Sequence, residues 1–307
     1  MQSYNCLAKV WGWHRYIWSN KREGTLHDDI WRNDPSLLSD KPSSHIDQAI
    51  YWQIGSGNIG HHYNQDIYGV YRLATLYPNV PILIDLENTS QSLYKPGDSL
   101  TTKGLRWGEV VSGILLHSLP NPKLFFEWNT IYSIGCFYHA PRDYFFETDL
   151  AMFGKSCASE IRDTIQAAIV RQPSNKITIL QRIKPGRQIL NLDQGFAILR
   201  QHHRNIHVIS DPDVTNLEQI LSSSTLLASR GAALTDGFLM PRNSQVFCLG
   251  HAPGWFENIR PLFADLEIDY QLVACRNVEA TRYEWTHDAN NSDFYVPWEQ
   301  VCRLIKS

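Results

Sequence analysis

The sequence lacks the cysteine and histidine spacings that bind zinc. Its six cysteines are scattered along 307 residues without a CxxC pair, at Cys6, Cys136, Cys157, Cys248, Cys275 and Cys302. A zinc site or a dense disulfide framework would need closely spaced cysteines. We therefore expect reduced and mostly buried thiols, with neither a zinc site nor a set of disulfide bridges.

Long apolar runs are also missing. No window approaches the ~20 apolar residues that a membrane-spanning helix needs. The N-terminal stretch MQSYNCLAKVWGWHRYIW has neither the apolar centre nor the small-residue cleavage site of a signal peptide. We expect a cytoplasmic protein without a membrane span.

An excess of positive charge is absent too. The chain has 28 Lys and Arg against 31 Asp and Glu, for a net charge of −3. Such a balance gives no broad basic surface, so neither nucleic acid nor an anionic membrane is an expected partner. Any anion that this protein binds must be held by a local group of side chains.

What the sequence does contain is enough apolar material for two ordinary domains. Hydrophobic residues make up 43% and charged residues 19% of the chain, which is typical of a globular protein. A helix is predicted at 159–171, and the polar stretch Gln172-Pro173-Ser174-Asn175 then interrupts the pattern. We place the domain boundary there, giving domains at 1–173 and 174–307, with the closing helix able to pack back on the first domain.

The first domain contains one clear β-α-β pattern. Residues 1–45 have no regular period and predict an irregular lead-in with one short helix or strand. Beyond them the pattern predicts strands at 49–54 and 80–86, a turn at 55–60, and helices at 61–76 and 107–116.

The second domain alternates strands and helices with short loops. Strands are predicted at 177–182, 206–209, 225–228, 244–249 and 270–275, and helices at 190–203, 215–223, 233–239, 255–265 and 298–306. This alternation favours a parallel sheet with helices on both faces, which makes the fold class α/β.

Two of these strands end in turns suited to a phosphorylated ligand. The strand at 177–182 leads into a loop with Arg182, Lys184 and Arg187, and the strand at 225–228 leads into Arg230-Gly231-Ala232-Ala233. Two guanidinium groups can hold a diphosphate, and small residues let a phosphate approach the amides at a helix N-terminus. The alternative is that the arginines face solvent or pair with Asp193 or Glu218.

A glycine turn in the first domain offers a different site. Gly55-x-Gly57-x-x-Gly60 follows a predicted strand and opens a helix, and Asp85 ends the next strand, as in a dinucleotide fingerprint. The bulky residues after Gly60 and the distant Asp85 favour a structural turn instead. A nicotinamide or flavin site stays as an alternative.

The helix after this turn carries candidate general bases. His61 and Asp66 are five residues apart, which places them about 140° apart around a helix, so they need not share a face. Either could take a proton from a substrate. Each could equally cap the helix or fill the core.

Taken in order, these motifs resemble the glycosyltransferase family 61 domain, which includes plant xylosyl- and arabinosyltransferases and animal O-linked N-acetylglucosaminyltransferases. The matching pieces are Arg182, Arg187 and Asn191 as Arg-x4-Arg-x3-Asn, then Leu217-Glu218-Gln219-Ile220, Gly231-Ala232-Ala233-Leu234-Thr235-Asp236 and Leu239-Met240-Pro241, and, in the first half, Asn58-x-x-His61 with Tyr63. The chain departs from the family's His-Gly-Ala-Gly-Leu-Thr-Asn by having Arg230, Ala233 and Asp236.

The resemblance implies a GT-B architecture, in which two Rossmann-like domains face an interdomain cleft. It implies an inverting transferase that moves a sugar, xylose first, from a UDP-sugar to a hydroxyl of a glycan or glycopeptide acceptor. Asp66, or failing that His61, would be the base. The donor would be bound by Arg182, Arg187, Asn191, Arg230, Gly231, Ala232 and Ala233.

The resemblance also implies that no metal or other cofactor is required, because arginines would stabilise the leaving diphosphate. The one Asp-x-Asp pair, Asp211-Pro212-Asp213, lies between a predicted strand and helix, where a turn and cap are expected. Three alternatives stay open: a UDP-N-acetylglucosamine-dependent transferase, a dinucleotide-dependent oxidoreductase using the Gly55–Gly60 turn, and a non-catalytic glycan-binding relative.

Overall fold

The structure is a computed structural model that forms two compact units, Met1–Ile161 and Arg162–Ser307, called here the N-terminal and the C-terminal unit. The residues that it describes are 2–11, 14–19, 31–33, 36, 39, 41–42, 44–54, 67–86, 93–95, 98, 107–127, 130–139, 157–170, 172, 174–183, 186–210, 213–229, 231–250, 260–278 and 292–306. The division after Ile161 falls inside helix α5 (Ala158–Ile169), about one helix length before the predicted boundary at 173.

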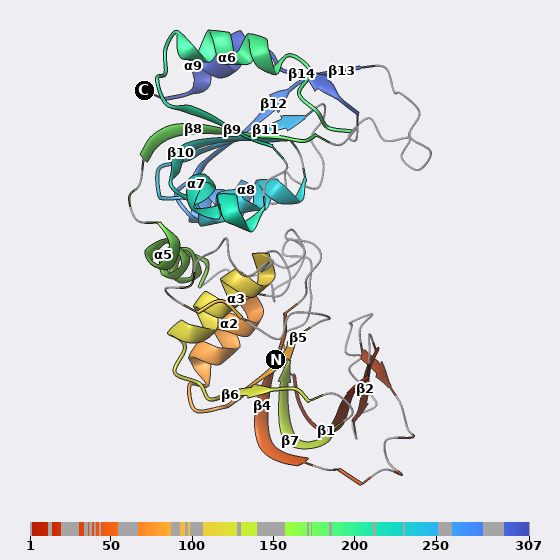
Figure 1. The fold of residues 1–307 in the computed structure, drawn as a ribbon. Coiled ribbons are helices and arrows are strands. Elements are labelled where there is room, and N and C mark those ends of the chain that lie inside the picture. The colour runs from red at the N-terminus through yellow and green to blue at the C-terminus, as the bar shows by residue number, and fades with distance from the viewer. Residues whose placement is uncertain are drawn as a thin grey trace. The chain divides into compact units, whose positions relative to one another are not determined.

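A seven-stranded sheet forms the centre of the N-terminal unit (Figure 1), in the order β3-β2-β1-β7-β4-β5-β6. Its strands are β1 (Gln2–Trp11), β2 (His14–Ser19), β3 (Trp31–Asn33), β4 (Ser44–Ile54), β5 (Ile82–Leu86), β6 (Lys123–Phe125) and β7 (Ile131–His139). β7, β4, β5 and β6 are parallel neighbours, whereas β1 pairs antiparallel with both β7 and β2.

The predicted β-α-β unit is confirmed. Helix α2 (Ile67–Leu76) connects β4 to its parallel neighbour β5, and it buries Ile67, Val70, Tyr71 and Ala74, which lie on one helical face. The predicted helix near 107–116 is also present, as α3 (Trp107–Ser118), and it ends two residues before Pro120.

The prediction of an irregular lead-in at residues 1–45 is wrong. The described residues of this region include the strands β1, β2 and β3, and β1 pairs with β7, whose register joins Gln2 to His139. No strand had been predicted at β7 either. The partners of β7 are the distant strands β1 and β4, so the local pattern carries little signal for β7.

The C-terminal unit contains the predicted parallel sheet, with five strands in the order β12-β11-β10-β8-β9. The strands are β8 (Ser174–Gln181), β9 (Ile206–Ser210), β10 (Ser223–Ser229), β11 (Gln245–Gly250) and β12 (Asp269–Ala274). β10 and β11 are buried along almost their whole length, as expected of central parallel strands covered on both faces. The α/β class is therefore confirmed.

Helices cover both faces of this sheet (Figure 1). Helices α6 (Leu192–Arg200) and α9 (Trp298–Leu304) lie on one face, and α7 (Leu217–Leu221) and α8 (Arg260–Asp265) on the other. The predicted helix at 233–239 is a 3-10 helix, η4 (Ala232–Leu239), and a second one, η3 (Val214–Asn216), precedes α7. A short hairpin of β13 (Arg276–Asn277) and β14 (Phe294–Tyr295) completes the unit.

The closing helix α9 belongs to the core of the C-terminal unit. Trp298, Val301 and Ile305 join a buried cluster with Ile179, Leu227 and Phe247 of the sheet. Among the residues described, no helix is both long and apolar enough to cross a bilayer.

Candidate functional site

The strand order of the C-terminal unit creates a switch point between β8 and β10. These strands are neighbours, with Leu180 opposite Ala228, but the chain continues from β8 to β9 on one side and from β10 to β11 on the other. In open α/β sheets, ligands bind beyond the carboxyl ends of the strands at such a point. Both sequence motifs for a phosphorylated ligand follow these two strands.

The segment after β8 has an unusual backbone in the Arg187 loop (residues 186–190). Gly186 has φ 91° and Arg187 has φ 67°, so two consecutive residues adopt left-handed conformations. For a residue with a side chain, this conformation costs roughly 1–2 kcal/mol. Such strain persists only where the surroundings hold it, and it is common at binding sites.

The segment after β10 meets this loop at Gly231. Gly231 has φ 152° and ψ −173°, a conformation that essentially only glycine adopts. A Cβ atom on Gly231 would lie 2.6 Å from Nη1 of Arg187. The guanidinium of Arg187 therefore rests against the bare backbone of Gly231, and the fold brings together two of the predicted donor-binding residues.

The other predicted donor-binding residues lie in differing surroundings. Arg182 lies directly after the end of β8 and is half-buried. Ala232 and Ala233 open η4, whose first N–H groups have no partner within the helix. Arg230 lies outside the described residues.

The side-chain amide of Asn191 forms hydrogen bonds to other groups of the protein. Its Nδ2 donates to the carbonyl of Val296 at 2.9 Å, and its Oδ1 accepts the N–H of Val296 at 2.9 Å. Nδ2 also contacts Oε1 of Gln194 at 3.1 Å. In this structure the Asn191 amide holds the segment before α9 to the start of α6.

The candidate bases and the glycine turn of the N-terminal unit, His61, Asp66 and Gly55–Gly60, lie outside the described residues. Asp85, which the dinucleotide interpretation would use for a ribose, is within them. It is buried, and the hydroxyl of Tyr51 donates to its Oδ2 at 2.5 Å. A ribose at this carboxylate would have to share it with the tyrosine.

Asp236, in the glycine motif, has an uncommon environment. It is fully buried, and neither of its oxygens has a hydrogen-bond partner among the described residues. Burial raises the pKa of this carboxyl well above its ordinary value. A protonated Asp has nearly the shape of Asn, the residue that the family 61 motif has at this position.

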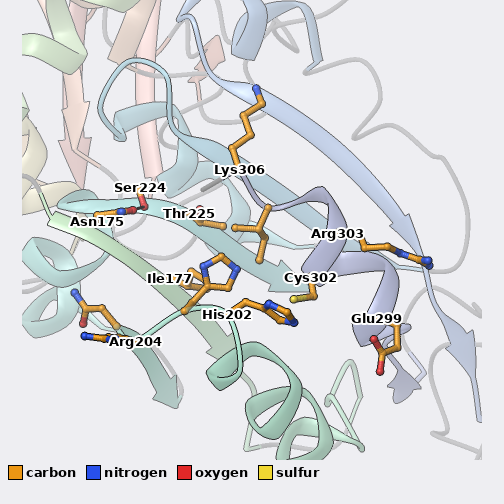
Figure 2. Close-up of a pocket in the computed structure, with 13 residues that line it drawn as sticks. Asn175, Ile177, His202, Arg204, Ser224, Thr225, Glu299, Cys302, Arg303 and Lys306 are labelled. Atoms are coloured by element: carbon orange, nitrogen blue, oxygen red, sulfur yellow. Dashed lines mark hydrogen bonds between the residues drawn. The ribbon is translucent and has the colours of Figure 1, made fainter.

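A pocket of about 630 Å³ lies at the opposite, amino edge of the same sheet (Figure 2). Asn175, Ile177, Ser224 and Thr225, from the beginnings of β8 and β10, line it together with residues 202–205 and the end of α9. It contains several basic side chains, but Lys306 and Arg303 extend in different directions.

Two further features make this pocket a poor anion site. Nζ of Lys306 already pairs with Asp269 at 2.8 Å. Burial, and then the neighbouring His202, lower the pKa of His203 and so reduce its positive charge. We therefore favour the carboxyl edge, where Arg187 contacts Gly231 at the switch point.

Sequence reasoning missed one residue of this site. Asp293 Oδ1 accepts hydrogen bonds from the backbone N–H groups of Gly186 and Gln188, each at 2.9 Å. More than a hundred residues separate Asp293 from the loop, and no local pattern marks it. Only the return of the chain along β14 places it there.

No family model matches the chain, and no curated protein matches it either. The likeness to glycosyltransferase family 61 therefore rests on the quoted motifs alone.

Proposed function

We propose that the chain is an inverting, metal-independent glycosyltransferase that moves a sugar from a UDP-sugar to a hydroxyl of a glycan acceptor. Xylose is the first expected sugar and N-acetylglucosamine the second. The observation that supports this function best is the contact of Arg187 with Gly231 at the switch point of the parallel sheet. The family resemblance supplies the substrate class, and the proposed GT-B arrangement would bring an acceptor domain to this site.

The proposed reaction assigns a role to each part of the site. The acceptor oxygen attacks the anomeric carbon while the bond from that carbon to the diphosphate oxygen breaks, and the electron pair leaves with UDP. Asp66, or failing that His61, takes the proton of the acceptor hydroxyl. The stereochemistry inverts because the nucleophile and the leaving group lie on opposite sides of the carbon.

The leaving diphosphate gains negative charge, and the C-terminal unit has groups to stabilise it. The guanidinium of Arg187 can form two parallel hydrogen bonds to phosphate oxygens. The missing side chain at Gly231 makes room for this guanidinium, and the first N–H groups of η4 supply further donors. Fixed donors of this kind stabilise developing charge without reorganising during the reaction.

Thermal unfolding with added ligand tests the donor class. UDP at ~100 times its dissociation constant should stabilise the protein by about 2.7 kcal/mol, whereas NAD should not. Arg187→Ala should weaken UDP binding roughly 10- to 100-fold, the value of a hydrogen bond to a charged group. Arg204→Ala, an exposed arginine at the other edge of the same sheet, is the matched control and should bind UDP normally.

Each contrary result has a distinct meaning. A shift with NAD and none with UDP would favour the dinucleotide-dependent oxidoreductase. UDP binding without consumption of any UDP-sugar across an acceptor panel would favour the glycan-binding relative. Near-normal transfer by Asp66→Asn would remove Asp66 from the role of base.

A further inference from the structure

The Arg187 loop is held in shape by a segment from the end of the chain. Phe294 donates its N–H to the carbonyl of Gln188 at 3.0 Å, and Leu190 donates its N–H to the carbonyl of Phe294 at 3.0 Å. Ile189 and Phe294 form a parallel bridge. The loop therefore has the strand β14 as a backbone partner along one side.

Asp293, one residue before this bridge, binds the part of the loop that is strained. Its Oδ1 accepts the N–H groups of Gly186 and Gln188, the two residues that flank Arg187. The N–H groups of Gly186 and Gln188 therefore point toward one oxygen, as backbone N–H groups do in a small concave anion site. In this loop the Asp293 carboxylate already occupies that position.

This arrangement separates the roles of the loop's backbone and side chain. Because two of its amides are used by Asp293, a phosphate cannot bind to them. The loop can offer positive charge only through its side chains. The direction in which the Arg187 side chain points follows from the left-handed backbone that Asp293 stabilises. Its guanidinium then lies against Gly231, where a ligand at the switch point would meet it.

We propose that Asp293 is a positioning residue of the donor site, acting through Arg187 on the diphosphate of the nucleotide sugar. This inference rests on the proposed function. It means that the Asp293 carboxylate contributes to binding the diphosphate without contacting it.

A double-mutant cycle tests the proposal, with inorganic pyrophosphate and UDP as the probes in calorimetric titrations. Asp293→Ala should weaken both probes roughly tenfold or more, and Asp293→Asn should restore most of the affinity because its amide oxygen can accept the same two N–H groups. Arg187→Ala combined with Asp293→Ala should bind no more weakly than Arg187→Ala alone, since the two residues act as one unit.

Hydrogen exchange at the amides of Gly186 and Gln188 gives a second readout that needs no ligand. Both amides should exchange faster in Asp293→Ala than in the wild type, and not in Asp293→Asn. Glu299→Ala, an exposed carboxylate in the same C-terminal segment, is the control and should change neither exchange nor affinity. If the alanine variant does not fold, Asp293→Glu, which moves the carboxylate by one methylene group, replaces it.

The outcomes distinguish the proposed function from the proposed positioning role of Asp293. If the wild type binds neither probe, the proposed function fails, and the exchange measurement alone decides whether Asp293 holds the loop. Unchanged exchange in Asp293→Ala would overturn the inference. So would normal affinity in that variant, or losses from Arg187→Ala and Asp293→Ala that simply add.

Discussion

At the scale of single residues, Asp236 shows how a polar side chain can persist in an apolar interior. Its carboxyl group is fully buried, and its oxygens have no hydrogen-bond partner in the described part of the chain. An ionised carboxylate in such a place would be very costly, so burial raises the pKa of Asp236 and favours its protonated form. The protonated form has nearly the shape of an Asn side chain, although not its hydrogen-bonding groups.

Asp236→Asn is expected to stabilise the protein near neutral pH and to lose this advantage in acid. The pKa of Asp236 is raised by burial in the folded state, so above the ordinary carboxyl pKa the unfolded chain has released a proton that the folded chain retains. Stability of the wild type therefore falls as pH rises between these two pKa values, by up to about 1.4 kcal/mol per pH unit. The variant should lack this slope.

Chemical denaturation of both proteins from about pH 4 to about pH 8 checks this expectation. A difference in unfolding free energy that stays constant across the range would show that Asp236 is ionised in the folded protein, or that its burial has no cost.

At the scale of elements, the contact between α6 and α9 depends on the absence of one side chain. Gly195 is buried in the middle of α6, and a Cβ atom there would overlap the indole of Trp298. The indole cannot easily move away, because its Nε1 donates to the carbonyl of Asn191 at 2.9 Å. Packing thus requires a residue that helix propensity disfavours.

Gly195→Ala should destabilise the protein by ~1–3 kcal/mol, although alanine favours a helix by about 1 kcal/mol over glycine. The matched control is Ala197→Gly, at an exposed position of the same helix, which should cost only the propensity difference of about 1 kcal/mol. Urea unfolding of the two variants measures both effects. A Gly195→Ala protein as stable as the wild type would mean that α9 can shift without cost.

At the scale of the whole molecule, each compact unit contains a buried thiol whose reactivity can report whether that unit is folded. Cys157 lies in the N-terminal unit and Cys275 in the C-terminal unit, and both side chains are buried. Burial raises the pKa of each thiol to about 12. Since only the thiolate reacts, each should be inert while its unit is folded.

Iodoacetamide at about pH 8 should therefore leave Cys157 and Cys275 unmodified in the native protein and modify both in concentrated guanidinium chloride. Mass spectrometry of the labelled peptides over a denaturant series gives a transition for each unit. UDP should move the Cys275 transition to higher denaturant, because the proposed donor site lies in that unit. Rapid native labelling of either cysteine would contradict its burial.

Particular residues show how much of the fold and of the candidate site could be predicted from the sequence. The parallel sheet of the C-terminal unit was predictable because buried strands such as β10 and β11 are short apolar runs between polar turns. The loops after β8 and β10 were recognisable from arginine and glycine for the same local reason. β7 was not, because both of its partner strands, β1 and β4, lie far away in the chain.

The sequence by itself determined which residue types follow each strand, since turn chemistry and apolar period are local properties. The tertiary structure decided which of them meet. It placed Arg187 against Gly231 by setting β8 beside β10, it engaged Asn191 with Val296, and it brought Asp293 to the loop from the other end of the unit. Such contacts depend on strand order and chain return, and neither is encoded by any single stretch of sequence.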